Sequence, residues 1–338
     1  MNTVFLYAGQ GSQKPGMGLD LYEQYPAYRA FAESLDPGFD HLKLMHEGPE
    51  DTLSRTEYTQ FCMGVFQAGV TRLLLDEGIR PAAACGLSLG EYGALLAAGV
   101  FGDTDYLQLL KFRGAAMAEA SAGLTCCMSA VLGADYETVL EACETYSGQF
   151  LKGSAAENAP EPKADISAGP APRVTVANCN CPGQNVICGD EEDVTAVEAL
   201  LREKGVRRFV HLKVSGPFHT SRMAPAGEAL RGRFRDMDLN APRIPVAMNV
   251  TGRFLDPAED IAELLVRQVQ GTVLLTQDLT SLLDAGYTDF TEIGPGSTMA
   301  GFLKKTAKAA GKAVTVRSIE TADDLRAAVA ALKGAGKE

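Results

Sequence analysis

A serine lies between two glycines in Gly86-Leu87-Ser88-Leu89-Gly90. This Gly-x-Ser-x-Gly spacing is typical of a nucleophile elbow, a sharp strand-to-helix turn that exposes the serine hydroxyl. The flanking residues agree, because 82–85 has the pattern of a short strand and 89–98 that of a helix rich in small residues. The positive end of that helix would stabilise negative charge at Ser88, and the Leu89 N–H would point at an oxyanion. A Gly-rich turn can also produce this spacing by chance, but its context favours a nucleophile.

A serine nucleophile needs a general base, and the chain has four histidines. His41 and His46 lie in a polar stretch near the N-terminus, and His211 has an alternating position in an expected strand. His219 follows Ser215-Gly216-Pro217-Phe218, which we expect to form a rigid turn. Elimination favours His219, although a single histidine is more often structural when judged from position alone. A base with an ordinary imidazole pKa would lose activity as the pH falls through about 6 to 7.

The segments around these residues predict an α/β fold. Residues 4–8 read as a buried strand that leads into a glycine-containing loop, and residues 53–75 read as a helix. Residues 125–213 follow the order β-α-β-β-α-β, which is typical of a ferredoxin-like subdomain. After residue 214 the α/β pattern resumes. We therefore expect a discontinuous large domain, 1–124 and 214–338, with a small subdomain, 125–213, inserted into it.

Residues 148–172 are rich in Ala, Pro, Gly and Ser and show no periodic apolar pattern. Such a composition cannot bury enough apolar surface to order a chain. We expect this segment to be an exposed, flexible loop within the small subdomain.

Composition narrows the class of protein. The formal net charge is −12. We therefore do not expect the protein to bind nucleic acid non-specifically, since such binding depends on basic residues that neutralise phosphates. The eight cysteines lack zinc-ligand spacing and are expected to be reduced and mostly buried. The first residues lack the basic region of a signal peptide, and no run of 18 apolar residues occurs. The sequence predicts a cytoplasmic protein that needs neither a membrane nor a metal.

Seven motifs together resemble those of the malonyl-CoA:acyl carrier protein transacylases, in the same order and over about residues 3–335. That family has an α/β-hydrolase-like domain with an inserted ferredoxin-like subdomain, in agreement with the fold expected above. The motifs are Gly9-Gln10-Gly11-Ser12-Gln13, Ser88-Leu89-Gly90-Glu91-Tyr92, Arg113-Gly114 with Met117, Asn180-x-Pro182-Gly183-Gln184, Gly216-Pro217-Phe218-His219, Leu265-Val266-Arg267-Gln268 and Glu292-Ile293-Gly294-Pro295-Gly296.

The resemblance implies a role for each matching residue. Ser88 would be the acyl-accepting nucleophile and His219 its base, with the imidazole held by the backbone carbonyl of Gln268 rather than by a carboxylate. The backbone N–H groups of Gln10 and Leu89 would form the oxyanion hole.

Two further residues would select the acyl group. Arg113 resembles the arginine that holds the malonyl carboxylate, a task suited to its planar fork of donors. Judged without the motif, an arginine in this helical segment is more often a solvated surface residue. Bulky Phe218, beside the base, resembles the residue type found where malonyl rather than methylmalonyl is accepted.

The chain departs from the family pattern at four places. Leu87 replaces the histidine that usually precedes the serine, and Ala8 replaces the proline that opens the first loop. Gln60-Phe61-Cys62-Met63 and Gly271-Thr272 replace a Gln-Pro-Ala-Leu and an Asn-Pro segment. Of these four departures, Leu87 lies nearest the candidate nucleophile Ser88, so we expect it to affect the catalytic rate.

The resemblance implies transfer of a malonyl group from malonyl-CoA to the phosphopantetheine thiol of acyl carrier protein. The transfer would supply fatty acid or polyketide synthesis, and the enzyme would be a monomer without a permanently bound cofactor.

Residues 202–243 carry ten Lys or Arg against four Asp or Glu, a charge balance that suits docking of an acidic carrier protein. A normally solvated surface explains any single one of these charges equally well. Two alternatives stay open: a serine acyl hydrolase or thioesterase of the same fold, and a weakly catalytic carrier-binding protein.

Overall fold

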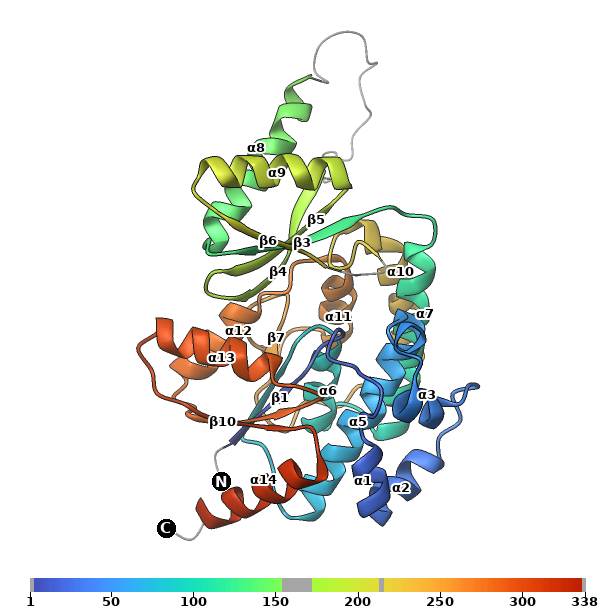
Figure 1. Ribbon diagram of the computed structural model, residues 1–338. Coiled ribbons are helices and arrows are strands. Elements are labelled where there is room, and N and C mark those ends of the chain that lie inside the picture. Colours follow the sequence, from blue (N-terminus) through green and yellow to red (C-terminus); the bar gives the residue numbers. More distant parts are fainter. Residues whose placement is uncertain (1–2, 154–171, 213–215, 336–338) are drawn as a thin grey trace.

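The computed structural model describes residues 3–153, 172–212 and 216–335, which form two layers of α/β structure stacked on one another (Figure 1). The first stretch forms β1 (Thr3–Tyr7), α1 (Leu19–Gln24), α2 (Pro26–Glu33), α3 (His41–Glu47), α4 (Glu50–Leu53), α5 (Thr56–Asp76), β2 (Ala83–Gly86), α6 (Leu89–Ala97) and α7 (Asp103–Ser121). The middle forms β3 (Cys127–Leu132), α8 (Tyr136–Gly153), β4 (Val174–Cys181), β5 (Gln184–Gly189), α9 (Glu191–Glu203) and β6 (Arg208–His211). The last stretch forms the short 3₁₀ helix η1 (Ser221–Met223), α10 (Ala224–Phe234), β7 (Ala247–Met248), β8 (Arg253–Phe254), α11 (Ile261–Gln270), α12 (Leu275–Asp284), β9 (Asp289–Ile293), α13 (Thr298–Ala309), β10 (Thr315–Ile319) and α14 (Ala322–Ala335).

The large domain is built on a parallel sheet with the strand order β10-β9-β1-β2. Because side chains alternate along a strand, Phe5 and Tyr7 of β1 join one apolar core while Val4 and Leu6 join another. Helices α5, α6 and α7 contribute to the first core, and α12 and α13 to the second. Both faces of the sheet are therefore covered, as expected for parallel strands.

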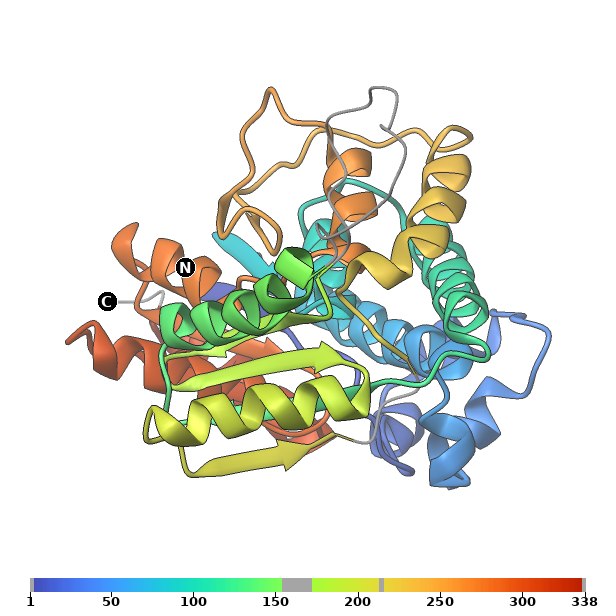
Figure 2. The ribbon, with the colours of Figure 1, turned by 90° about the horizontal axis from the view of Figure 1, so that it is seen from above.

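The small subdomain is an antiparallel sheet with the order β4-β5-β3-β6. With α8 after β3 and α9 after β5, this is the ferredoxin-like arrangement. Figure 2 shows α8 and α9 on the outer face of this sheet. Its inner face contributes Met128, Ala130, Val186 and Cys188 to the core that contains α5 and α7. The predicted fold class is confirmed, and shared apolar packing holds the two sheets against each other.

Helix α8 corrects one prediction. It extends to Gly153, so residues 148–153 are helical rather than part of a loop. An internal glycine lowers helix stability by only about 1 kcal/mol relative to alanine, so Gly148 does not end the helix. The rest of that predicted loop, residues 154–171, lies outside the described residues. The exact domain boundaries stay a prediction.

All eight cysteines fall within the described residues and are free thiols, and six of them are buried. This agrees with the expectation of reduced, mostly buried cysteines. Across the described residues, no helix combines the length and the apolar character needed to cross a membrane.

Candidate active site

The predicted nucleophile elbow is present between β2 and α6. Ser88 has φ 53° and ψ −100°, a conformation that residues other than glycine seldom adopt. The flanking glycines make the turn possible: a Cβ at Gly86 would lie 2.0 Å from the Gly90 backbone, and one at Gly90 would lie 2.2 Å from the Tyr7 carbonyl oxygen. Only glycine fits at either position, so the two glycines allow the strand and helix to approach closely enough to present Ser88.

His219 is the histidine that the fold brings to Ser88. Its Nε2 lies 2.8 Å from Ser88 Oγ, and its Nδ1 lies 2.8 Å from the backbone oxygen of Gln268. A carbonyl oxygen only accepts, so Nδ1 carries the hydrogen and Nε2 is free to accept the serine proton. The predicted orienting carbonyl is therefore in place, in α11.

Burial, followed by the positive charge of Arg113, lowers the pKa of His219 to about 4. The base is thus neutral well below pH 6. We therefore expect the acid limb of activity near pH 4 rather than between about 6 and 7, since the latter range assumed an ordinary imidazole.

Two of the other three histidines, His41 and His211, have structural surroundings. His41 is buried against Phe61, and its Nε2 lies 3.0 Å from the Ala32 carbonyl oxygen. His211 lies 2.8 Å from the carboxylate of Glu198 in the small subdomain. The elimination that favoured His219 agrees with these positions.

Arg113 lies on α7 with only 1% of its surface exposed, so the alternative of a solvated surface arginine is wrong. Its Nη2 lies 3.1 Å from Ser88 Oγ and 2.8 Å from the side-chain oxygen of Gln268. Its Nη1 donates to the side-chain oxygen of Gln60 at 2.8 Å, and its buried Nε has no hydrogen-bond partner among the described residues. A buried guanidinium with unused donors beside the nucleophile is suited to bind an anionic part of a substrate.

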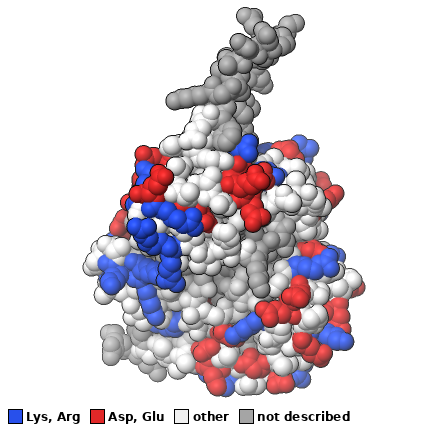
Figure 3. All heavy atoms as spheres, turned by 45° about the horizontal axis from the view of Figure 1, so that its top comes forward, with Lys and Arg blue, Asp and Glu red and all other residues white. Residues whose placement is uncertain are grey.

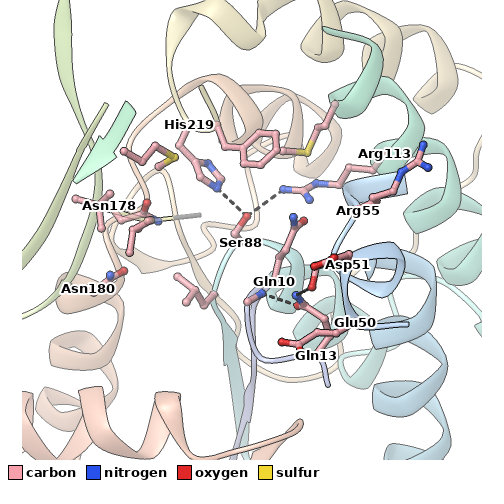
Figure 4. A pocket seen from close by; sticks show the side chains of 18 residues that line it. Gln10, Gln13, Glu50, Asp51, Arg55, Ser88, Arg113, Asn178, Asn180 and His219 are labelled. Atoms are coloured by element: carbon pink, nitrogen blue, oxygen red, sulfur yellow. Dashed lines mark hydrogen bonds between the residues drawn. The ribbon is translucent and has the colours of Figure 1, made fainter. Parts of the chain in front are cut away.

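Ser88 opens into a cavity of about 690 Å³ between the two layers. Figure 4 shows the side chains of His219 and Arg113 reaching Ser88 from opposite sides, with Asn178 and Asn180 on the wall formed by the small subdomain. The other residues that line the cavity include Gln10, Glu50, Asp51, Arg55, Leu87, Met117, Met128, Leu212 and Phe218. The cavity is large enough for the acyl end and part of the arm of a thioester substrate.

The two predicted oxyanion-hole residues come from different parts of the chain. Gln10 follows β1 and lines the cavity, and Leu89 is the first residue of α6. Neither backbone N–H donates to another group within the part of the chain that the structure describes. Both donors therefore remain available for a ligand oxygen, as an oxyanion hole requires.

Sequence reasoning missed four polar groups around this centre. They are the side chains of Gln60, Glu91, Asn249 and Gln268, all fully buried. Gln60 was noticeable as the one residue retained in a segment that otherwise departs from the family pattern. No sequence pattern indicated a role for Asn249, because it lies in a short strand region without a motif.

No group of three or more potential metal-ligating side chains occurs among the residues that the structure describes. The prediction of an enzyme without a metal stays a prediction.

Comparison with known proteins gives the same family throughout. The model of the acyl transferase domain matches residues 4–145 and 149–333. The malonyl CoA-acyl carrier protein transacylase of Bacillus subtilis is 33% identical over 306 residues, which is 89% of either chain.

Solved structures agree with the sequence comparison. The malonyl CoA-acyl carrier protein transacylase of Clostridium perfringens superposes with a TM-score of 0.86 at 32% identity and covers 99% of this chain and 98% of its own. A malonyl-transacylase solved in complex with its type II PKS acyl carrier protein gives 0.84 at 30% identity and covers 97% of this chain and 99% of its own. The chain therefore belongs to the acyl transferase domain family and, within it, to the malonyl CoA-acyl carrier protein transacylases.

Proposed function

We propose that this enzyme transfers a malonyl group from malonyl-CoA to the phosphopantetheine thiol of acyl carrier protein, by way of a malonyl ester on Ser88. One observation carries the proposal: Ser88 Oγ lies within hydrogen-bond distance of both a neutral base, His219, and a buried cation, Arg113. The neutral base can accept the hydroxyl proton of a serine nucleophile, and the buried cation can bind the free carboxylate of a dicarboxylic acyl group. The relatives' names and the neighbour that binds a carrier protein support the two substrates.

In the first half-reaction, Ser88 Oγ attacks the thioester carbonyl while His219 Nε2 takes the hydroxyl proton. A bond forms between Oγ and the carbonyl carbon, and the carbonyl oxygen becomes an oxyanion facing the Gln10 and Leu89 N–H groups. When the tetrahedral intermediate collapses, the C–S bond breaks and the CoA sulfur takes the proton from His219. The product is a malonyl ester of Ser88 and free CoA.

The second half-reaction reverses these steps with another thiol. His219 takes the proton of the phosphopantetheine thiol, and the sulfur attacks the ester carbonyl. The C–O bond to Ser88 then breaks, and Oγ recovers the proton from His219. The enzyme returns to its starting state, so neither a metal nor a redox cofactor is required.

Arg113 and Phe218 would determine which acyl group is accepted. The guanidinium would hold the malonyl carboxylate through paired hydrogen bonds, with Nη2 exchanging its contact to Ser88 Oγ for one to the substrate. Phe218 lines the cavity and is 7% exposed, so its ring would limit the space for a branch on the acyl chain.

An acidic carrier protein would dock on the basic region at residues 202–243. Part of its charge is locally neutralised, since Arg202, Lys204, Arg222 and Arg231 form ion pairs with acidic residues. Arg207 and Arg208 are exposed and have no ion pair within the described residues. Figure 3 shows a group of Lys and Arg side chains on the left of the visible face, acidic side chains near its centre, and smaller basic groups beside acidic side chains on the right.

Charge reversal tests this docking surface. Arg207→Glu with Arg208→Glu should lower kcat/KM for the carrier protein severalfold and weaken its salt dependence, with malonyl-CoA kinetics unchanged. Arg80→Glu is the matched control, because Arg80 is exposed and precedes β2, at the opposite end of the sheet from Ser88. Equal effects of the reversals at both places would contradict the docking site.

A transfer assay separates this function from hydrolysis. With malonyl-CoA and carrier protein, we expect malonyl-carrier as the main product and ping-pong kinetics, which give parallel double-reciprocal lines. Free malonate as the main product would instead favour the acyl hydrolase. The cytoplasmic location and the monomeric state belong to the same proposal, and the free cysteines support a reducing compartment.

A further inference from the structure

A buried polar cluster lies behind the elbow, and the mechanism above does not use it. Its centre is Asn249, which directly follows β7 and is fully buried. The Asn249 Nδ2 donates to the Gly86 carbonyl at 2.8 Å, and its Oδ1 accepts the Ser88 N–H at 2.8 Å. One side chain therefore bridges the two residues that flank Leu87 in the turn.

Asp278 determines which way this amide faces. It lies on α12, is fully buried, and its Oδ2 accepts a second hydrogen from Asn249 Nδ2 at 2.9 Å. The Gly86 carbonyl and the Asp278 carboxyl group both accept from the same nitrogen, so that nitrogen must face them. The Oδ1 of Asn249 is then left to face the Ser88 N–H.

The Ser88 carbonyl is held from the other side. Gln268 Nε2 donates to it at 2.8 Å and also donates to Glu91 Oε2, while Glu91 Oε1 accepts the Asn249 N–H at 2.6 Å. Both peptide groups of Ser88 are thus fixed by groups from outside its own turn. This support matters because the backbone conformation of Ser88 is one that costs about 1–3 kcal/mol without compensating contacts.

We propose that Asn249, oriented by Asp278, is a positioning residue that holds the acyl-accepting serine in its reactive conformation. Asn249 acts through Ser88 and lines no part of the substrate cavity. The inference rests on the proposed function, since it concerns the rate at which Ser88 is acylated.

The role of Asp278 does not require a charge. Burial raises the pKa of Asp278 well above its usual value, and the nearby Glu91 carboxyl group raises it further. Burial also raises the pKa of Glu91 to about 8. A neutral acceptor at 278 should therefore serve as well as the acid, and asparagine supplies one of the same size.

The test is single-turnover acylation by malonyl-CoA, followed by quenched-flow and intact mass over a range of substrate concentrations. For Asn249→Ala, Asn249→Asp and Asp278→Leu we expect the maximal acylation rate to fall about 10- to 100-fold, because small displacements of a nucleophile have effects of this size. The malonyl-CoA concentration that gives half this rate should change less than about twofold, since the cavity wall is unaltered. Asp278→Asn should acylate within about threefold of wild type.

Ser129→Ala is the matched control for a buried polar truncation. Ser129 donates to Glu198 at 2.7 Å inside the small subdomain, away from the elbow. This variant should lose stability and keep its acylation rate. The inference is overturned if Asn249→Ala acylates at the wild-type rate, or if Asp278→Asn loses as much as Asp278→Leu. If Asn249→Ala and Asp278→Leu do not fold, Asp278→Asn still tests the inference. A more than tenfold loss of acylation rate in folded Asp278→Asn would contradict it. Failure of the wild type to form an acyl-enzyme would instead remove the proposed function itself.

Discussion

The Arg113 guanidinium donates to the hydroxyl oxygen of Ser88 across 3.1 Å, so the group expected to select the substrate also touches the nucleophile. The two residues lie on α7 and at the start of α6, 25 positions apart in the chain. A single buried cation is therefore expected to influence both acyl selection and the pKa of the base.

Replacing Arg113 should separate malonyl from acetyl transfer. In Arg113→Ala the malonyl carboxylate would be buried without a partner, which costs on the order of 3–5 kcal/mol. At about 1.4 kcal/mol per decade, kcat/KM for malonyl-CoA should fall by roughly two to four decades. Acetyl-CoA has no carboxylate, so its rate should stay the same or rise. An equal loss for both thioesters would assign Arg113 to the fold or to the oxyanion site.

The pH dependence should reflect a base that titrates unusually low. Because burial and Arg113 lower the pKa of His219 to about 4, the base stays neutral above that pH and becomes protonated below it. The kcat/KM for malonyl-CoA, which reports the free enzyme, should be level between pH 7 and about 5 and fall through about 4.

Removal of the neighbouring charge tests the cause of this shift. In Arg113→Ala, assayed with acetyl-CoA, the acid limb should move to higher pH, since one of the two influences that disfavour the imidazolium is gone. An acid limb near pH 6.5 in the wild type, or an acid limb at the same pH in Arg113→Ala as in the wild type, would be inconsistent with a His219 pKa lowered by burial and by Arg113.

Phe218 should control the size of the acyl group. Phe218→Ala removes a ring from the cavity wall beside the base. One extra methyl group in a pocket is worth about 1–3 kcal/mol, so the kcat/KM ratio of methylmalonyl-CoA to malonyl-CoA should rise at least about tenfold. Competition between the two thioesters in one reaction measures this ratio directly. An unchanged ratio would place the size limit elsewhere in the cavity.

The glycines of the elbow should be intolerant of any side chain. A Cβ at Gly86 would lie 2.0 Å from the Gly90 backbone, so Gly86→Ala should lower the free energy of unfolding by about 3 kcal/mol. Gly301 is the control: it is exposed inside α13 with no atom within 4 Å of an added Cβ. Gly301→Ala should raise stability by about 0.5–1 kcal/mol. Urea unfolding of the two variants beside the wild type would show opposite shifts, and a tolerated Gly86→Ala would speak against a tightly packed turn.

The elbow could be predicted because its signal is local. Two glycines around Ser88, a strand before it and a small-residue helix after it all lie within a few residues of one another. His219 and Arg113 are remote in sequence, and their recruitment was implied by elimination and by resemblance to a family. The contact between Arg113 and Ser88 itself depends on how α7 packs against α6, which no local pattern specifies.

Other features depended on tertiary packing and could not be predicted. The low pKa of His219 results from burial, which the residue type does not reveal. Asn249 and Asp278 lie after residue 214, where the sequence predicted only that the α/β pattern resumes and offered no motif at either position. The extension of α8 past Gly148 shows a helix continuing where composition favoured a loop. Local propensity is a weak guide wherever neighbouring elements supply the stabilising contacts.

The most direct test of the account is the intact mass of the protein after brief exposure to malonyl-CoA, with wild type and Ser88→Ala measured side by side. If the malonyl group is carried on Ser88, the wild type should gain one malonyl group, Ser88→Ala should gain none, and added carrier protein should remove the group from the wild type. Labelling that persists in Ser88→Ala, or a wild type that stays unmodified, would contradict it.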